Sequence, residues 1–263
     1  MPRISYFKLI LYCFGLVICT TLTLTMKEKC HGYIMPAEQL VDYMAANFSK
    51  FKTLVITQAT QQIDQRYEET EKVFKEQILM KSPDLFYSRV LDQNGDRATP
   101  PDITYRQLLV ANKKQRLEQL LSMLGIDLQS VAFTRIDGII AYRIGDKLPD
   151  SPKILIEKER FLPLLLVYRE SGNPEGDTIT VRFRGYRKLD KGFYPYEISY
   201  SVGDKIREIY TIQTLQANVP VNSSLLHPFE ISSYPQDQAS ENVQSEIEEE
   251  RLRRIIKTFQ EKY

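Results

Sequence analysis

Few residues of this chain have the types and spacing that catalysis or metal binding requires. The two histidines are His31 and His227, and the three cysteines, Cys13, Cys19 and Cys30, lie near the N-terminus. A zinc site built on several histidines or cysteines is therefore excluded. The rest of the chain also has no disulfide framework and no thiol site.

One acidic segment resembles the start of a calcium-binding loop. It is Asp92–Asp96, with the sequence DQNGD. The sixth position of such a loop needs glycine and holds Arg97, and the twelfth needs glutamate and holds Ile103. We interpret the segment as a turn, and we predict no bound metal and no cofactor.

Motifs of common enzymes are also missing from the sequence. There is no Gly-x-Ser-x-Gly elbow, no phosphate-binding loop and no dinucleotide fingerprint. Carboxylates are plentiful, but spacing singles out no pair, and charged side chains are mostly solvated. We predict that the protein is not an enzyme. A lipid-modifying enzyme would need a polar pair at the mouth of a cavity, and the sequence points to none.

The charge balance restricts the class of partner. Lys and Arg total 35, Asp and Glu total 34, and the formal net charge is +1. A broad nucleic-acid surface needs a basic excess to displace counterions, so we expect no nucleic-acid partner. The chain has 16 Tyr, 12 Phe and no Trp. Tyrosine suits a half-buried sheet, where the ring packs and the hydroxyl reaches water.

Residues 1–32 have the features of a signal peptide or an N-terminal membrane anchor. Arg3 and Lys8 are basic, and the charge-free apolar run Leu9–Cys19 follows. This order is typical of export signals. The uncharged stretch Leu9–Met26 approaches the ~20 residues of a transmembrane helix, so a retained anchor stays open beside a cleaved signal.

Two amphipathic helices are predicted in the body of the chain. The first covers Met35–Phe48, with Pro36 in its first turn. The second covers Asn112–Gly125, with Asn112 as its N-cap and Gly125 at its end. Their apolar stripes at helical spacing need an apolar surface to cover. These stripes are formed by Leu40, Met44 and Phe48 and by Leu117, Leu120 and Leu121.

The remaining pattern is that of strands. Thr178–Arg184 alternates cleanly, with Ile179, Val181 and Phe183 on one face. An order of helix, strands, helix and more strands predicts an α+β fold with one large antiparallel sheet that curls. The other expected strands are Leu54–Thr60, Lys72–Met80, Leu85–Leu91, Val131–Arg135, Gly138–Ile144, Ile154–Ile156, Leu164–Tyr168, Tyr194–Val202 and Ile206–Leu215.

The run Arg160–Arg169 (RFLPLLLVYR) is almost continuously apolar. Pro163 should interrupt a strand or lie at its edge. Simple alternation places Leu162, Leu164, Leu166 and Tyr168 on one face and Leu165 and Val167 on the other. Both faces are apolar, so we expect this strand to be covered on both sides.

The folded domain should extend over residues 33–230, and residues 231–263 should form a polar linker and a charged C-terminal helix. Ser245 and Glu248 have the spacing of a capping box at the start of that helix. Its imperfect apolar stripe could dock on the domain, bind a partner, or do neither.

Several segments together resemble the LolA/LolB lipoprotein-carrier superfamily. A helix ends at Asn47-Phe48, and Phe74–Val90 follows with a Lys-Ser-Pro break. Then come, in order, Ile136–Gly145 (IDGIIAYRIG), Glu159–Leu164 (ERFLPL), Val181–Arg187 (VRFRGYR) and Gly192–Tyr196 (GFYPY). The resemblance implies an unclosed half-barrel whose mouth is covered by helices. It implies a non-catalytic carrier in the periplasm that shields acyl chains during transfer toward the outer membrane.

The expected partners are an acylated lipoprotein or a phospholipid, together with a membrane-bound donor or acceptor protein, and we expect a monomer. The lid would be formed by the two apolar stripes given above. A register error of one residue would exchange the two faces of any strand in the lining. The expected lining consists of Leu54, Ile56, Phe74, Ile78, Met80, Ile140, Tyr142, Leu164, Leu166, Val181 and Phe183.

Two alternatives to a lipid carrier remain open. The helices could fill the sheet and form an ordinary core, which regular apolar spacing usually indicates. The same fold could then serve as a periplasmic interaction or sensor module that binds a partner protein in place of lipid.

Overall fold

The structure is a computed structural model and describes residues 34–64, 70–92, 104–169, 176–190 and 192–228. The chain divides between Ile34 and Met35, and the unit that begins at Met35 is the one considered below. The expected leader, the Asp92–Asp96 turn beyond Asp92, and the expected C-terminal helix lie outside the described residues. In the described ranges no helix is long and apolar enough to cross a membrane.

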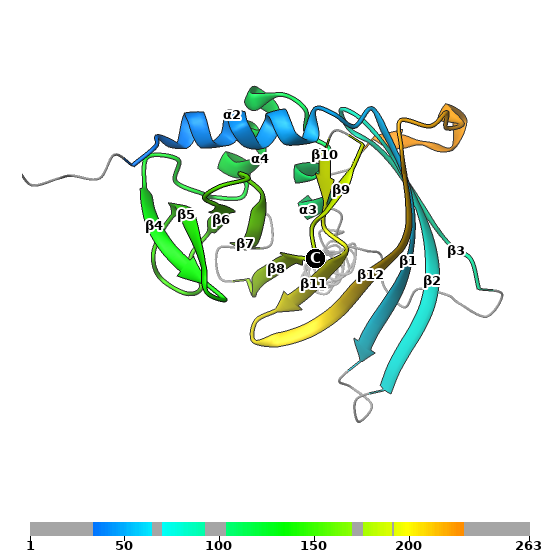
Figure 1. Cartoon of the computed structure of the whole chain (residues 1–263). Coiled ribbons are helices and arrows are strands. Elements are labelled where there is room, and N and C mark those ends of the chain that lie inside the picture. Colours follow the sequence, from blue (N-terminus) through cyan, green and yellow to red (C-terminus); the bar gives the residue numbers. More distant parts are fainter. Residues whose placement is uncertain (1–33, 65–69, 93–103, 170–175, 191, 229–263) are drawn as a thin grey trace, which may run out of the picture. The chain divides into compact units, whose positions relative to one another are not determined.

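One antiparallel sheet dominates the unit (Figure 1). Its eleven strands are β1 (Thr53–Asp64), β2 (Thr70–Lys81), β3 (Leu85–Val90), β4 (Val131–Ile136), β5 (Ile139–Gly145), β6 (Lys153–Glu157), β7 (Pro163–Arg169), β8 (Thr178–Arg184), β11 (Glu197–Val202), β12 (Lys205–Ala217) and β13 (His227–Pro228). Their spatial order is β13-β3-β2-β1-β12-β11-β8-β7-β6-β5-β4. The edge strands β13 and β4 do not pair with each other, so the sheet forms an unclosed half-barrel, as predicted.

Three helices accompany the sheet. They are α2 (Ala37–Phe48), α3 (Thr104–Leu108) and α4 (Lys114–Met123). The two predicted helices are confirmed as α2 and α4, whereas α3 was not predicted. Figure 1 shows α2 lying across the half-barrel and α3 lying within its curve.

The predicted cap of the second helix is wrong. α4 begins after Lys113, and no side chain caps its first turn. The side-chain oxygen of Asn112 is instead buried without a hydrogen-bond partner. Gly125 has φ +77°, the left-handed conformation that commonly ends a helix, in agreement with the predicted end.

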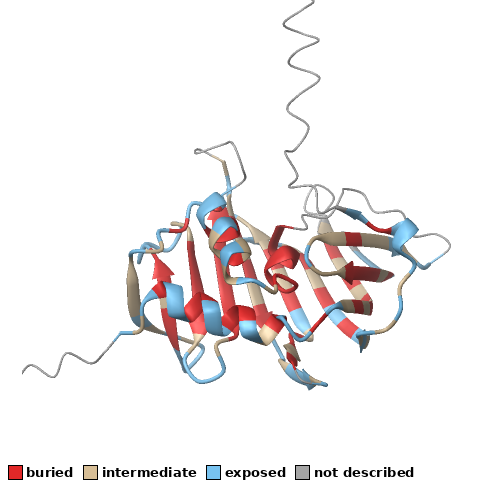
Figure 2. Ribbon diagram, turned by 90° about the horizontal axis from the view of Figure 1, so that it is seen from above, coloured by how far each residue is buried: buried red, intermediate tan, exposed pale blue. Residues whose placement is uncertain are grey.

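Buried apolar side chains form two clusters on opposite faces of the sheet. The large inner cluster joins the concave face to α2, α3 and α4. A smaller outer cluster contains Ala141, Leu155, Leu164, Leu165 and Val167. Figure 2 shows that buried residues concentrate on the strands beneath the helices. The expectation that β7 is covered on both faces is confirmed, because its first six residues are all buried.

The predicted face of Leu164 is wrong because β7 carries a bulge. Leu155 pairs with Leu165, whereas Ile156 pairs with Pro163. Leu164 is therefore an extra residue without a partner on β6, and such a residue breaks the alternation. Leu164 joins the outer cluster, while Leu166 belongs to the inner one. Pro163 is the first residue of β7, a position where its missing N–H is tolerated.

The predicted strand Tyr194–Val202 is divided in two. Gly192–Tyr194 is β10, which pairs with β9 (Arg187–Leu189) in a separate two-stranded sheet, and β11 starts at Glu197. Pro195 stands between them and has no N–H to donate to a ladder. Tyr194 is fully buried as a result and belongs to the inner cluster.

Gly192 permits a close approach that positions β10. A Cβ at this position would lie 2.5 Å from Cζ of Phe51, whose ring is buried. We expect Gly192→Ala to reduce the free energy of unfolding by about 1–3 kcal/mol through overpacking. Urea denaturation measures this loss, and Phe51→Leu in the same chain should restore part of it. Strictly additive effects of the two substitutions would contradict the contact.

Candidate functional site

The concave face of the half-barrel is the candidate site. From β5 to β11 its inward positions are apolar or aromatic, and neighbouring strands keep them in register. They provide a continuous surface that excludes water. These inward residues are Tyr142, Ile144, Ile154, Ile156, Leu166, Tyr168, Ile179, Val181, Phe183 and Ile198, all buried in the inner cluster.

Most residues of the expected lining lie together on this face. The inner cluster contains Leu54, Ile56, Ile78, Met80, Tyr142, Leu166, Val181 and Phe183. Phe74 is buried on β2, two residues from Glu76 and four from Ile78, and so shares their face. Leu164 lies on the other face, as described above. Ile140 is 44% exposed near the start of β5 and is not part of the inner cluster.

The expected lid residues cover this face. Leu40, Met44 and Phe48 on α2 have no exposed surface. Leu117, Leu120 and Leu121 on α4 are buried as well. Lid and lining form one packed cluster, so the helices occupy the concave face in this structure.

α2 is held to the sheet by apolar packing and few directional contacts. Near its end, Asn47 Nδ2 donates to the backbone oxygen of Arg160 at 2.6 Å. The rings of Tyr43 and Phe161 are stacked with centroids 4.6 Å apart. α2 and α4 are joined to each other by the ion pair of Glu38 with Lys114.

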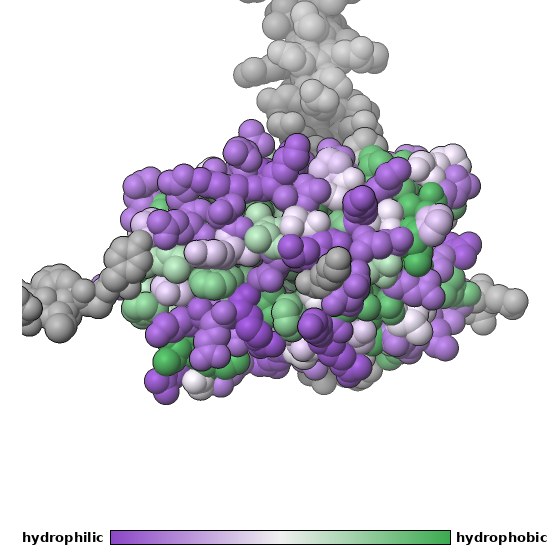
Figure 3. All heavy atoms as spheres, turned by 45° about the horizontal axis from the view of Figure 1, so that its top comes forward, coloured by the Kyte–Doolittle hydropathy of each residue, from purple (hydrophilic) through white to green (hydrophobic). Residues whose placement is uncertain are grey.

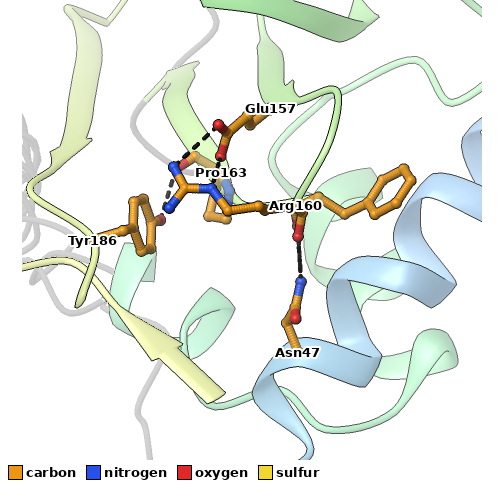
Figure 4. Close-up of polar contacts among 6 residues, drawn as sticks. Asn47, Glu157, Arg160, Pro163 and Tyr186 are labelled. Atoms are coloured by element: carbon orange, nitrogen blue, oxygen red, sulfur yellow. Dashed lines mark hydrogen bonds and ion pairs between the residues drawn. The ribbon is translucent and has the colours of Figure 1, made fainter. Parts of the chain in front are cut away.

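The turn that receives Asn47 is itself well fixed (Figure 4). The guanidinium of Arg160 donates to both carboxylate oxygens of Glu157, at 2.8 and 3.0 Å. Tyr186 donates from its hydroxyl to the backbone oxygen of Pro163 at 2.7 Å. The β6–β7 turn is therefore held by several hydrogen bonds, and Asn47 links α2 to it.

The outer surface of the helical side differs from its interior. Figure 3 shows that hydrophilic side chains predominate there, with smaller apolar patches among them. The amphipathic helices thus present polar residues to solvent while they cover the apolar lining.

A polar stripe crosses the concave face on β1, β2 and β12. Gln58 Nε2 donates to Glu76 Oε2 at 3.0 Å, and the Thr60 hydroxyl donates to the same oxygen at 2.5 Å. Gln62 Nε2 donates to Glu208 Oε1 at 3.0 Å, and the Tyr210 hydroxyl donates to Glu208 Oε2. All six of these stripe positions are buried.

Arg106 of α3 lies against this stripe and is 1% exposed. Its Nη2 donates to Gln58 Oε1 at 3.2 Å. The guanidinium carbon lies 5.2 Å from the ring centroid of Tyr105 and 4.9 Å from that of Tyr210, within the range of cation–π contacts. We call Arg106, Tyr105, Gln107, Tyr194 and the stripe residues the Arg106 cluster.

Sequence reasoning missed the Arg106 cluster. The sequence does contain one indication of a buried polar group. Gln58, Thr60 and Gln62 alternate along β1 and share a face with Leu54 and Ile56. Polar residues at inward positions usually have buried partners. The partner, Arg106, lies on a helix of five residues that has no periodicity to detect.

Burial changes the acidity of the tyrosines around this cluster. It raises the pKa of Tyr194 to about 12, against the opposing effect of Arg106. It also raises the pKa of Tyr105. Both hydroxyls stay protonated at any physiological pH and act as hydrogen-bonding groups, not as acids.

In the described ranges no group of three His, Cys, Asp or Glu residues could hold a metal ion.

No protein-family model matches the sequence, and no curated protein matches it. A solved LolA superfamily protein from Nitrosomonas europaea is similar, with 8% identity and a TM-score of 0.47 over 73% of this chain and 97% of that chain. A proposed outer membrane lipoprotein-sorting protein domain from Vibrio parahaemolyticus has 9% identity and a TM-score of 0.45, over 71% of this chain and 94% of its own. A DUF1329 family protein from Desulfovibrio piger has 10% identity and a TM-score of 0.45, over 72% and 94%.

The raised pKa of Tyr194 predicts a loss of stability at alkaline pH. Between the usual tyrosine pKa of about 10 and the folded value of about 12, the unfolded chain has lost the Tyr194 proton and the folded chain keeps it. The free energy of unfolding should therefore fall as pH rises through this window, by up to about 1.4 kcal/mol per pH unit for this group.

Urea denaturation at several pH values between about 8 and 11.5 measures the slope. Tyr194→Phe should remove the contribution of Tyr194 to this slope, so the variant's free energy of unfolding should fall less steeply than that of wild type. Equal slopes for wild type and Tyr194→Phe would contradict the prediction.

Proposed function

We propose that this protein binds an acylated molecule, a lipoprotein or a phospholipid, with its acyl chains against the concave face of the half-barrel. The observation that carries the proposal is the chemical match between the lining and its cover. The lining from β5 to β11 is apolar, and α2 covers it mainly with Leu40, Met44 and Phe48. These side chains offer the contacts that an acyl chain would offer.

The free energies make such an exchange feasible. Each buried methylene contributes ~0.8 kcal/mol, and this gain must offset the burial that the apolar face of α2 loses when the chains replace it. Displacement of α2 breaks the hydrogen bond from Asn47 and the stacking of Tyr43 on Phe161. Both are modest interactions. Release of the cargo then requires closure of the helices or a tighter acceptor.

Features of the sequence support a cellular location for this proposed activity. Residues 1–32 have the order of an export signal or anchor, and the described domain contains no cysteine. We propose a periplasmic carrier that works between membrane-bound donor and acceptor proteins, without catalysis. If the leader is retained, the protein acts as a receptor fixed at the inner membrane.

Native mass spectrometry of the full chain, purified from an exporting bacterial host, tests the proposal. We expect co-purified phospholipid or acylated peptide at about one molecule per protein, or uptake of added acylated peptide to that ratio. A mass that corresponds to protein alone, with no uptake of either ligand, would contradict the proposal. The concave face would then be an ordinary core, and a partner-binding module would explain the fold better.

Asn47 gives a prediction about the rate of exchange. Asn47→Ala removes the hydrogen bond to Arg160, worth about 1 kcal/mol, from the closed arrangement only. We expect a fluorescent acyl probe to enter about five-fold faster in stopped-flow measurements. Asp42→Ala, at an exposed position of the same helix, should leave the rate unchanged. Equal rates for wild type and Asn47→Ala would show that α2 does not control entry.

A further inference from the structure

Four aromatic rings form a continuous row from the edge strand β4 to the helix α2. The ring centroids of Phe133 on β4 and Tyr142 on β5 lie 4.7 Å apart. Those of Tyr142 and Phe161 are 6.5 Å apart, those of Phe161 and Tyr43 are 4.6 Å apart, and both pairs are stacked. We call Phe133, Tyr142, Phe161 and Tyr43 the aromatic row. It joins the edge of the half-barrel to its helical cover.

Both ends of the aromatic row are open to solvent, although Tyr142 within it is buried. Phe133 is 41% exposed and Tyr43 is 48% exposed. Ile140, which is also exposed, lies on the same face of the sheet as Phe133, because it pairs with Arg135, two residues further along β4. Large apolar side chains that gather in one exposed place mark a surface for interaction.

Cations border the exposed end of the aromatic row. Arg135 is exposed on the same face of β4 as Phe133. Lys158 is exposed as well, and its Nζ lies 5.5 Å from the centroid of the Phe133 ring. Neither Arg135 nor Lys158 forms an ion pair with a carboxylate in the described part of the chain. Their charges are therefore available to an anionic partner.

Carboxylates of the neighbouring strand ends are bound to other cations. Glu157 is paired with Arg160, and Asp137 is paired with Arg184. Glu159 is exposed in the β6–β7 turn and offsets one cation at most. The surface around the aromatic row thus keeps an excess of positive charge.

The carboxylates of α2 act on a cation of α4. Glu38 forms an ion pair with Lys114. The hydrogen bond to Glu38 raises the pKa of Lys114, and the charge of Asp42 adds to this effect. Tyr43 of the same helix is stacked on Phe161 instead.

Exposed rings with cations beside them fit a lipid bilayer better than a second protein. Aromatic side chains concentrate where the head groups of a membrane meet its hydrocarbon, and Lys and Arg are attracted to anionic lipids. Lys158 suits this environment, because its stem can lie along apolar surface while its ammonium group stays among head groups. The centres of protein–protein interfaces, in contrast, are depleted of lysine.

We propose that the aromatic row, together with Ile140, Arg135 and Lys158, docks this protein on the surface of an anionic lipid bilayer. Phe133 and Ile140 enter the head-group region, and the two cations bind lipid phosphates. The inference goes beyond the proposed function and does not depend on it, because a surface can dock on a membrane whether or not the concave face takes up cargo.

Docking at this place would bring the membrane close to the cover of the concave face. The aromatic row ends at Tyr43 of α2, and the stacking of Tyr43 on Phe161 breaks when α2 is displaced. An acyl chain that leaves the docked bilayer would therefore have a short route to the inner face of β5.

The chain contains no tryptophan, so one introduced tryptophan reports its own surroundings. Phe133→Trp places it in the aromatic row. Val73→Trp is the control, at a 61% exposed position of β2, far from β4 in the order of the strands (Figure 1). Because each tryptophan senses only its own environment, an N-terminal segment held in the bilayer gives no signal by itself.

Fluorescence of the full chain mixed with vesicles tests the proposal. The vesicles contain phosphatidylglycerol and phosphatidylcholine, with some brominated phosphatidylcholine that quenches tryptophan on contact. We expect a blue shift and quenching for Phe133→Trp and neither for Val73→Trp. Vesicles of phosphatidylcholine alone should bind weakly, and salt should reverse the signal because it screens exposed charges. Urea denaturation confirms that both variants are folded.

Charge variants in the Phe133→Trp background identify the cations responsible. Lys158→Gln and Arg135→Gln should each weaken binding to the anionic vesicles about five-fold, the usual contribution of one cation near such a surface. Lys75→Gln removes an exposed lysine of β2 and is the matched control, so it should bind as the background chain does.

The outcomes separate this inference from the proposed function. No signal from Phe133→Trp, or equal signals from Phe133→Trp and Val73→Trp, would overturn the docking surface and leave acyl-chain binding standing. A signal that persists at high salt and with phosphatidylcholine alone would indicate uptake of single lipid molecules, and it would overturn docking while it supports the carrier. Equal binding by Lys158→Gln, Arg135→Gln and Lys75→Gln would overturn the role of the cations.

Discussion

The concave apolar face of the sheet must be kept from water, and the rest of the fold follows from this constraint. An unclosed half-barrel cannot cover that face with its own strands, because β4 and β13 remain apart. α2 and α4 supply the cover with one apolar stripe each and show their polar sides to solvent. A surface whose cover is a separate element is suited to accept a different cover, and the proposed binding of acyl chains depends on this property.

The concave face is not uniform, and its two parts have different physical roles. The part from β5 to β11 offers only dispersion and exclusion of water, which do not distinguish one hydrocarbon chain from another. The part on β1, β2 and β12 carries carboxylates, amides and hydroxyls, with Arg106 pressed against them. Buried polar groups need hydrogen-bond partners, so the side chains of this part of the face are held by directional bonds to one another.

The sequence predicted the parts of this fold that periodicity governs. Alternation gave β8 with its bounds, and helical spacing gave the buried faces of α2 and α4. The prediction was wrong wherever a single residue interrupted this periodicity. The bulge at Leu164 moved that side chain to the outer cluster, and Pro195 divided the strand expected from Tyr194 onward. Most of the residues on the inner face could therefore be predicted, whereas Arg106 could not, because its position depends on long-range contacts of a five-residue helix.

Photo-crosslinking with a diazirine-bearing fatty acid would test the central claim most directly. The probe is added to the full chain, activated by light, and its adducts are mapped by mass spectrometry of peptides. Binding on the concave face predicts adducts on inner-face residues such as Leu166, Val181 and Phe183, which are buried in the free protein. Adducts restricted to exposed apolar residues such as Phe133, Ile139 and Ile140, or no adducts at all, would contradict it.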